Sequence, residues 1–164
     1  MAITLIACVD INNGIGDAEG NLLYKIKKDM KHFKSITSGK IVVMGRKTWD
    51  SLPKKPLEKR KNYVLTMDES FDPVGAKVLH DINEVIELGK KHDVYVIGGG
   101  EIYYQTIDFA DKLILTHVHE INTKSRVFFP DVDYRVWKLK NIQEHDKSDE
   151  HDFTFAFATY EKKK

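Results

Sequence analysis

Short apolar runs alternate with segments of helical periodicity along the first two thirds of the chain. Six runs end at polar or glycine-containing segments, and this pattern predicts strands that are buried on both faces. The runs cover residues 3–9, 41–44, 63–66, 76–79, 94–97 and 112–118. Buried strands that alternate with helices are typical of an α/β protein with a mostly parallel sheet.

Helices are predicted between several of these strands. The first is marked by residues at helical spacing and by a glycine stop, which are Ile26, Met30, Phe33, Thr37 and Gly39. A short helix is expected after the turn at 46–49, and residues 81–84 have the spacing of a capping box that opens another helix. A further periodic segment, 102–107, follows three consecutive glycines. Residues 14–21 are expected to form an irregular, mobile loop.

The C-terminal part of the chain departs from this alternation. Residues 136–142 and 153–160 are strand-like, and no helical segment lies between them. We therefore expect an α/β fold with a mostly parallel central sheet, an antiparallel C-terminal edge and helices on both faces. The length of 164 residues predicts a single domain, 1–164. Sheets of this kind bind ligands outside the carboxyl ends of their strands.

Composition and charge exclude several classes of function. The chain has 26 Lys and Arg residues against 25 Asp and Glu, so its net charge of +1 does not favour a nucleic-acid partner. No stretch approaches the length of a membrane span, so no membrane partner is expected. Cys8 is the single cysteine, which is typical of a reducing, cytoplasmic protein and excludes cysteine-based zinc sites. The histidines have no metal-ligand pattern, and we predict no metal.

Two glycine-containing turns follow predicted strands. Gly45-Arg46-Lys47-Thr48 combines free backbone N–H groups, two cations and a hydroxyl at the start of a helix, which is an arrangement that binds anions. Gly98-Gly99-Gly100 lets a ligand approach the backbone in the same way. The alternatives are an ordinary turn with solvated cations and a close strand–helix crossing. Together the two turns favour a long ligand that contains a diphosphate.

A third glycine group follows the first strand but does not predict a classical dinucleotide-binding fold. Gly14, Gly16 and Gly20 have a spacing one residue too long for the Rossmann fingerprint. No helix opens directly after them, and no acidic residue lies at the expected distance after a second strand.

Asp29 is the most informative single residue. On a helical wheel it lies within about 60° of Ile26 and within about 40° of Phe33 and Ile36, inside the apolar arc. A carboxylate there needs a partner. It is either a first-turn residue stabilised by the helix dipole or an acid that binds a planar pair of N–H donors on a ligand.

Six segments occur in an order that resembles one known family. They are Ile15-Gly16, Asp29 with Lys31-His32-Phe33-Lys34, Met44-Gly45-Arg46-Lys47-Thr48-Trp49, Val96-Ile97-Gly98-Gly99-Gly100, Leu115-Thr116-His117 and Phe128-Phe129-Pro130-Asp131. This combination covers nearly the whole chain and resembles dihydrofolate reductase. The resemblance implies NADPH-dependent reduction of 7,8-dihydrofolate to 5,6,7,8-tetrahydrofolate, by hydride transfer to pterin C6 and protonation of N5. Such a reaction supports one-carbon metabolism and thymidylate synthesis and is a target of antifolate inhibitors.

The resemblance also implies roles for individual residues. The expected catalytic residues are Asp29, Thr116 and Tyr24. Dihydrofolate is expected to contact Ile6, Ala7, Asp29, Phe33, Leu52, Arg60, Ile97 and Thr116. NADPH is expected to contact Ala7, Ile15, Gly16, Gly45, Arg46, Lys47, Thr48, Thr66, His80, Ile97, Gly98, Gly99, Gly100, Ile102 and Tyr103.

The chain departs from the family pattern before and after the site. Leu23-Tyr24 stands where members commonly carry Pro-Trp, and Lys27 replaces a usual proline. Ser125-Arg126-Val127 stands where many bacterial members have Gly-Asp-Thr, so loop closure and the rate-limiting step are expected to differ.

Two rival functions are compatible with the glycine turns. A non-catalytic nucleotide-binding module would retain both turns without needing Asp29 inside an apolar helix face. A reductase of a ribosylated pyrimidine on the same fold would bind NADPH without affinity for antifolates. A monomer is expected in each case.

Overall fold

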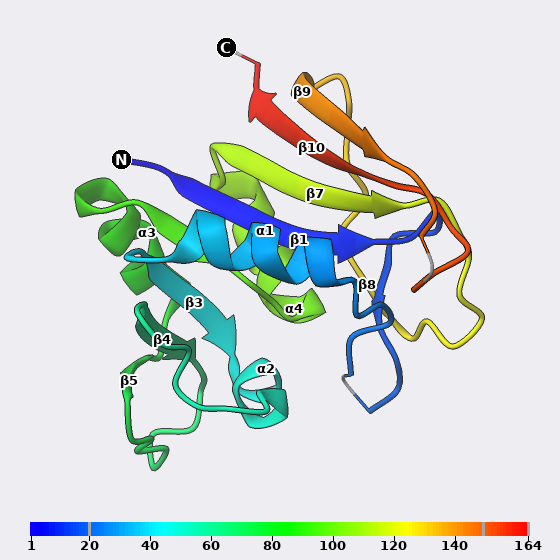
Figure 1. Cartoon of the computed structure of the whole chain (residues 1–164). Coiled ribbons are helices and arrows are strands. Elements are labelled where there is room, and N and C mark those ends of the chain that lie inside the picture. Colours follow the sequence, from blue (N-terminus) through cyan, green and yellow to red (C-terminus); the bar gives the residue numbers. More distant parts are fainter. Residues whose placement is uncertain (20, 149, 164) are drawn as a thin grey trace.

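The computed structural model describes residues 1–19, 21–148 and 150–163. Its main sheet has the order β5-β4-β3-β6-β1-β7-β10-β9 (Figure 1). These strands are β1 (Ile3–Val9), β3 (Ile41–Gly45), β4 (Lys61–Leu65), β5 (Ala76–Leu79), β6 (Val94–Val96), β7 (Lys112–Val118), β9 (Trp137–His145) and β10 (Phe155–Lys162). The helices are α1 (Lys27–Thr37), α2 (Arg46–Ser51), α3 (Ile82–Lys91) and α4 (Gly100–Thr106), followed by a 3₁₀ turn at Ile107–Phe109.

The predicted fold class is confirmed. All pairings from β5 across to β7 are parallel, and β10 pairs antiparallel with both β7 and β9. Helices α1 and α2 lie on one face of the sheet, and α3 and α4 lie on the other (Figure 1). The predicted capping box also forms, because the Asp81 side chain accepts from Asn83 and the Glu84 side chain accepts from the backbone N–H of Asp81.

Alternation along β1 decides which residues reach each face. Ile3, Leu5 and Val9 join the larger core beneath α3 and α4. Cys8 points to the opposite face and packs in a smaller cluster with Ile26, at the start of α1. Because β1, β3, β6 and β7 run parallel, their carboxyl ends meet at one edge of the sheet, beside the start of α1 (Figure 1).

Two local expectations were wrong. Part of the segment expected to be an irregular loop forms β2 (Gly14–Gly16), which pairs antiparallel with β8 (Val127–Phe128). The pairing spans more than 100 residues of sequence and involves only a two-residue partner, so no local pattern announces it. Gly14 has no room for a side chain, since an added Cβ would overlap Ser125. Gly20, from the third glycine group, lies outside the described residues.

The second correction concerns α1. Met30 was expected on the buried face, but its side chain is 58% exposed. The inner face instead carries Asp29, His32, Phe33 and Ile36, which are half-buried. A polar residue, His32, thus occupies the sheet-facing position, stacked on the Phe157 ring of β10 with 3.9 Å between ring centroids.

Within the described residues, no helix has the length and hydropathy needed to cross a membrane. The same ranges contain no group of three or more His, Cys, Asp or Glu residues arranged to hold a metal ion.

Candidate active site

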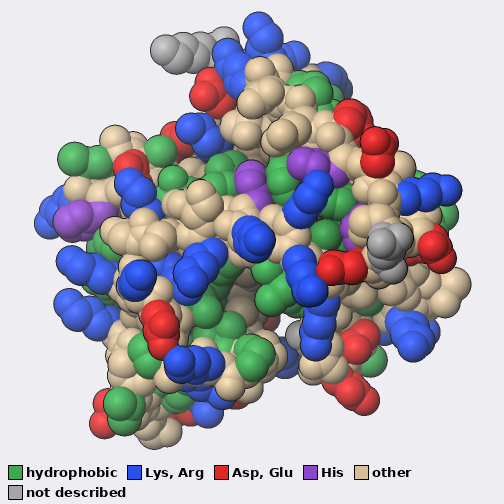
Figure 2. All heavy atoms as spheres, viewed as in Figure 1, with side chains coloured by type: hydrophobic (Ala, Val, Ile, Leu, Met, Phe, Trp, Pro, Cys, Tyr) green, Lys and Arg blue, Asp and Glu red, His purple; other side chains and the backbone are tan. Residues whose placement is uncertain are grey.

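A hollow opens directly beneath α1, with hydrophobic side chains at its walls and lysine and arginine side chains around its rim (Figure 2). It lies on the α1 and α2 face, near the edge where the parallel strands end. This is the position in which a sheet of this type binds ligands.

Asp29 is anchored to the central strands. The Thr116 hydroxyl on β7 donates a hydrogen bond to Asp29 Oδ1 at 2.5 Å. Cys8 on β1 is the direct partner of Thr116 in the parallel pairing, so its side chain projects to the same face of the sheet. The carboxylate inside the apolar arc therefore has in Thr116 the partner that its burial requires.

The environment of Asp29 has opposing effects on its pKa. Burial raises the pKa, because desolvation disfavours the charged form. The hydrogen bond from Thr116 lowers it, since this bond stabilises the carboxylate, and burial is the stronger effect. An acid with a raised pKa inside a concave site is a common feature of functional sites.

Apolar residues expected to contact the substrate come from four different elements. Ile6 and Ala7 lie on β1, Phe33 on α1, Leu52 at the end of α2 and Ile97 just after β6. Ile6 is buried, and the other four are half-buried. Leu52 and Ile97 pack against the cluster formed by Val42, Met44, Trp49 and Val64. Ile6 and Ile97, which are 91 positions apart in the sequence, thus lie on the face covered by α1 and α2, whereas the Ala7 side chain packs against the larger core on the opposite face.

Arg60 directly precedes β4, and its side chain lies beside Thr37, the last residue of α1. Its Nη1 donates to Thr37 Oγ1 at 3.2 Å, and its Nε donates to the Glu58 carbonyl at 2.9 Å. The guanidinium also lies over the Phe33 ring, 5.7 Å from its centroid. Burial lowers its pKa, while Glu58 raises it. Arg60 is therefore a cation fixed close to the apolar wall.

The two glycine turns, which lie far apart in the sequence, contact each other. The backbone N–H of Gly45 donates to the Gly98 carbonyl at 2.8 Å. Gly98 has φ of +126°, a conformation that favours glycine. The Thr48 hydroxyl lies against this turn, 3.4 Å from where a Cβ on Gly99 would stand. The backbone of the two turns is thus continuous, and within this glycine surface Gly99 is half-buried whereas Gly45, Gly98 and Gly100 are buried.

The last glycine of the triple and two later residues of α4 are buried. Gly100 packs against β8, and Ile102 and Tyr103 join the larger core. The Tyr103 hydroxyl donates to the Ile6 carbonyl at 2.6 Å, which ties α4 to β1. Ile15 on β2 is also in this core, and Gly16 is buried beside it. These positions support the glycine surface from below.

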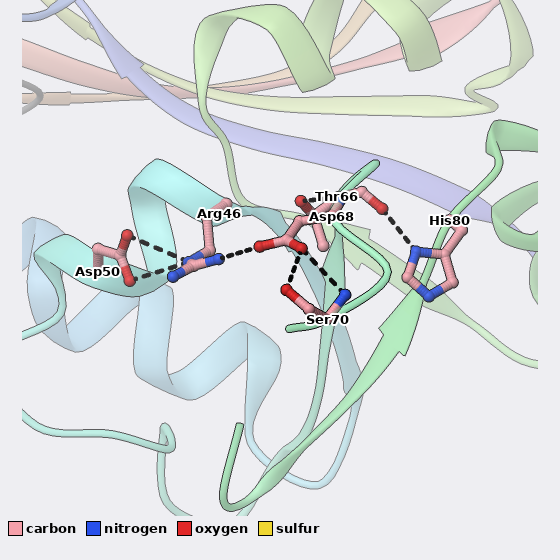
Figure 3. A network of polar contacts seen from close by, with 6 residues as sticks. All are labelled: Arg46, Asp50, Thr66, Asp68, Ser70 and His80. Carbon is pink, nitrogen blue, oxygen red and sulfur yellow. Dashed lines mark hydrogen bonds and ion pairs between the residues drawn. The ribbon is translucent and has the colours of Figure 1, made fainter. Parts of the chain in front are cut away.

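Arg46 is held in a surface network of ion pairs (Figure 3). Its Nε pairs with Asp50 at 3.2 Å and its Nη1 pairs with Asp68 at 3.4 Å. The guanidinium stacks on the Phe71 ring, 3.9 Å from the centroid. Lys47, the other cation of the turn, is exposed.

Thr66 and His80 join the same region through main-chain contacts. The His80 Nδ1 lies 2.8 Å from the Thr66 carbonyl, and the Asp68 N–H donates to Thr66 Oγ1 at 3.2 Å (Figure 3). Ser70 donates to Asp68 from its hydroxyl and its backbone, and these hydrogen bonds lower the pKa of Asp68. The carboxylate beside Arg46 is therefore fixed in place.

Tyr24 lies at the entrance to α1. Its ring contacts Phe153 edge-on, with 5.4 Å between centroids. Burial of the hydroxyl, followed by the charges of Asp10 and Glu120, raises the pKa of Tyr24 to about 12. Tyr24 also packs against the cluster of Ile26, Val118 and Phe155, which Cys8 contacts as well.

Sequence reasoning missed two residues of the site. Cys8 was interpreted only as a buried strand residue, and its position beside Thr116 emerges only from the pairing of β1 with β7. Asp10 is 3% exposed, and its carboxylate accepts from the backbone of Asn12, Gly14 and Asn122 and from the Ser125 hydroxyl. The sequence signal that could have identified Asp10 as an anchor for the following loop is its position as an acidic residue directly after a buried strand.

Comparison with known proteins agrees with this geometry. Residues 2–162 match the dihydrofolate reductase family. Dihydrofolate reductase of Bacillus subtilis (strain 168) is 33% identical over 162 residues, which cover 98% of this chain and 95% of that protein. Dihydrofolate reductase of Staphylococcus aureus (strain MSSA476) is 34% identical over 144 residues, covering 88% and 87%. A solved structure of dihydrofolate reductase from Enterococcus faecalis, complexed with NADP(H) and RAB-propyl, superimposes with a TM-score of 0.92 at 26% identity, covering 99% of this chain and 97% of that one. The chain therefore belongs to the dihydrofolate reductase family.

Proposed function

We propose that this protein reduces 7,8-dihydrofolate to 5,6,7,8-tetrahydrofolate with NADPH as the electron donor. The observation that carries the proposal is the Asp29 carboxylate, which is half-buried on the sheet-facing side of α1 and is held there by Thr116 on β7. Membership of the dihydrofolate reductase family supports the reaction, and the NADP(H) complex of the Enterococcus faecalis relative supports the cofactor.

The residues present fit a dinucleotide with two phosphate groups. In the glycine surface, Gly99 is half-buried and an added Cβ there would meet only the Thr48 hydroxyl, so a ligand can approach the backbone at this point. Arg46 and Lys47 supply cations beside it. When bound, NADPH supplies the hydride that reaches pterin C6. The residues that would hold it are Ala7, Ile15, Gly16, Gly45, Arg46, Lys47, Thr48, Thr66, His80, Ile97, Gly98, Gly99, Gly100, Ile102 and Tyr103.

Asp29 orients the pterin. Its carboxylate accepts hydrogen bonds from pterin N3 and the 2-amino group, and the fixed Thr116 hydroxyl supports the same contact. Ile6 and Ala7 line the ring, Phe33, Leu52 and Ile97 enclose the aminobenzoyl group, and Arg60 pairs with the glutamate tail.

Proton transfer completes the reaction. The hydride adds to C6 of the N5=C6 bond, and N5 takes a proton from water, so the bond becomes saturated. Asp29 favours this protonation by keeping negative charge close to the pterin. Tyr24 lies toward the loops, and we propose that it shapes water access and does not itself donate the proton.

The product and the ligand class follow from this reaction. Tetrahydrofolate supplies one-carbon metabolism and thymidylate synthesis, and diaminopyrimidine antifolates would pair with Asp29 as competitive inhibitors. We propose that residues 1–164 act as one domain and as a monomer.

The test is the fall in NADPH absorbance when purified protein is mixed with dihydrofolate. Consumption of NADPH only in the presence of dihydrofolate is the expected result. Binding of NADPH without consumption would indicate that the protein is a non-catalytic nucleotide-binding module. Consumption of NADPH with a ribosylated pyrimidine, together with no affinity for a diaminopyrimidine inhibitor, would indicate that the ribosylated pyrimidine is the substrate in place of dihydrofolate.

A further inference from the structure

We infer that Asp10 is a positioning residue for the proposed cofactor site. Its carboxylate joins the turn at residues 10–14, which leads into β2, to the loop at residues 119–126, which leads into β8. The two short strands then lie against the first residue of α4. The inference rests on the cofactor contacts proposed above for Ile15, Gly16 and Gly100, and Asp10 acts through these residues without touching NADPH.

The two carboxylate oxygens of Asp10 hold different segments of the chain. Oδ1 accepts hydrogen bonds from the backbone N–H groups of Asn12, at 2.9 Å, and Gly14, at 2.7 Å. Oδ2 accepts from the backbone N–H of Asn122 and from the Ser125 hydroxyl, both at 3.1 Å. The second pair of donors lies 112 and 115 positions away in the sequence. Asp10 is therefore a bridge between two distant loops.

The bridge depends on an ionised carboxylate. Asp10 is only 3% exposed, and its four donors are three backbone N–H groups and one hydroxyl. Four donors on two oxygens use all the acceptor positions of the ionised form. Such hydrogen bonds are roughly twice as strong as those between neutral groups. The bridge is also tightly closed, because an added Cβ at Gly14 would overlap Ser125 and would lie 2.9 Å from Asp10 Oδ2.

The bridged segments continue into a ribbon of two very short strands. β2 has three residues and β8 has two. The backbone N–H of Arg126 donates to the Gly16 carbonyl at 2.9 Å, and that of Phe129 donates to the Asn13 carbonyl at 2.8 Å. A two-stranded ribbon is only marginally stable by itself. We therefore expect the ribbon formed by β2 and β8 to depend on the bridge beside it.

The ribbon in turn shapes the proposed cofactor site. Ile15 is buried in the larger core together with Ile102 of α4. β8 packs against Gly100, where an added Cβ would lie 2.7 Å from Val127 Cγ1. Displacement of the ribbon would thus move Ile15 and Gly16 and would remove packing from the triple glycine. A carboxylate outside the glycine surface therefore controls how NADPH fits.

Two variants weaken the bridge, and a third is the matched control. Asp10→Asn keeps an oxygen for one side of the bridge, while its NH2 group faces donors on the other side. Ser125→Ala removes one hydrogen bond and no charge. Glu120→Gln removes an exposed charge from the same loop and retains the Glu120 backbone carbonyl, which accepts from the Ile11 N–H.

Two measurements separate positioning from folding. Native-state amide hydrogen exchange reports on the ribbon through the N–H groups of Arg126 and Phe129, with the amides of β7 as the internal reference. Equilibrium dissociation constants for NADPH and for a diaminopyrimidine inhibitor report on different parts of the site, because the inhibitor is proposed to pair with Asp29.

In Asp10→Asn, the Arg126 and Phe129 amides should exchange at least about tenfold faster relative to the β7 amides. NADPH should bind about three- to tenfold more weakly, the effect of losing one hydrogen bond, and inhibitor affinity should stay within about twofold of the wild-type value. Ser125→Ala should change ribbon exchange and NADPH affinity in the same direction by about two- to threefold. Glu120→Gln should change neither.

Wild-type exchange at Arg126 and Phe129 in Asp10→Asn would overturn the inference. Faster exchange with unchanged NADPH affinity would also overturn it, and so would equal losses of affinity for NADPH and the inhibitor. If Asp10→Asn does not fold, Ser125→Ala decides: faster ribbon exchange with weaker NADPH binding supports the inference, and wild-type values refute it. Neither measurement involves turnover, so a protein that binds NADPH without reducing dihydrofolate would refute the proposed reaction and leave this inference intact.

Discussion

The two halves of the candidate site are built on different physical principles. The substrate half centres on Asp29, a carboxylate held by Thr116 between a helix and two central strands. The cofactor half combines a bare glycine surface with Arg46, whose ion pairs with Asp50 and Asp68 lie at the surface. The side chains of these three residues are 40–57% exposed.

This difference determines where a single substitution has large effects. A buried charge is poorly screened, and removal of its partner leaves an uncompensated group, so changes near Asp29 are costly. Exposed ion pairs are screened by salt and contribute little. In the cofactor half, the backbone shape should therefore matter more than the visible ion pairs.

The largest effect is expected for Asp29→Asn. Asparagine preserves the acceptor for Thr116 but removes the charge and offers an amide donor where the pterin also donates. Hydride transfer in a single turnover should slow by about 100- to 1,000-fold. The dissociation constant for NADPH should change by less than about twofold, as expected for an exposed or uninvolved position. Equal losses in both measurements would indicate a structural role and would break the contrast between the halves.

A pair of glycine variants tests the cofactor half. An added Cβ at Gly100 would lie 2.7 Å from Val127 Cγ1 and 3.2 Å from the Phe128 carbonyl oxygen. Gly100→Ala should therefore lower the free energy of unfolding by about 1–3 kcal/mol, measured by urea denaturation. The same methyl group at Gly99 would meet only the Thr48 hydroxyl, at 3.4 Å.

Gly99→Ala should accordingly keep the wild-type stability within about 0.5 kcal/mol. It should nevertheless weaken NADPH binding about tenfold or more, because the methyl group stands on the surface proposed for the cofactor. Unchanged NADPH affinity in Gly99→Ala would remove that surface from the cofactor site.

A smaller effect is expected from the histidine on the inner face of α1. Burial, followed by the charge of His145, lowers the pKa of His32 below its usual value of 6.5. The unfolded chain then binds more protons than the folded chain just below pH 6.5, so stability is present above this value and is lost as the pH falls. His117, whose pKa is lowered by burial, acts in the same direction.

His32→Gln should make the free energy of unfolding fall less steeply between about pH 7 and 5, the range in which unperturbed histidines titrate. The exposed His92 provides the matched control, His92→Gln. Urea denaturation across this pH range is the measurement. An unchanged slope in His32→Gln would show that the stacked histidine does not contribute to acid sensitivity.

The positions of the main strands along the chain were well predicted because buried parallel strands are apolar runs bounded by glycine or polar residues. Residues 112–118, for example, form β7 with the predicted bounds. The pairing of β2 with β8 escaped prediction, since two short segments separated by more than 100 residues carry no local signal. Helical periodicity predicted α1, but it could not show that the sheet side would accept His32 and leave Met30 exposed.

Prediction of the site from the sequence was limited in a similar way. Asp29 was identifiable because a carboxylate inside an apolar arc is anomalous within one helix. The position of Cys8 beside Thr116 depends on strand register, which is a property of two strands. The carboxylate Asp68 beside Arg46 depends on the path of an irregular loop. Local anomalies can be read from sequence, whereas pairings between distant segments require the fold.

The smallest effect is expected from Asp68→Asn, which tests the surface side of the comparison. Asparagine retains an oxygen for the hydrogen bonds from Ser70 but removes the charge that pairs with Arg46. Because these side chains are exposed, the unfolding midpoint in urea should not change measurably. Arg46 becomes available to a phosphate, so NADPH should bind about two- to fourfold more tightly at low salt, and the gain should vanish near 1 M salt, where the Debye length is about 3 Å.

NADH separates a local effect from a general one, because it lacks the 2′-phosphate of NADPH, and we propose that Arg46 binds this phosphate. Its affinity should be unchanged in Asp68→Asn. Glu69→Gln removes the same charge from the adjacent exposed position and should alter neither affinity. If Asp68→Asn tightens NADH as much as NADPH, Arg46 does not select the phosphorylated cofactor. Discrimination would then have to come from Lys47 or from the glycine surface, and the cofactor half would depend on backbone shape even more than its ion pairs suggest.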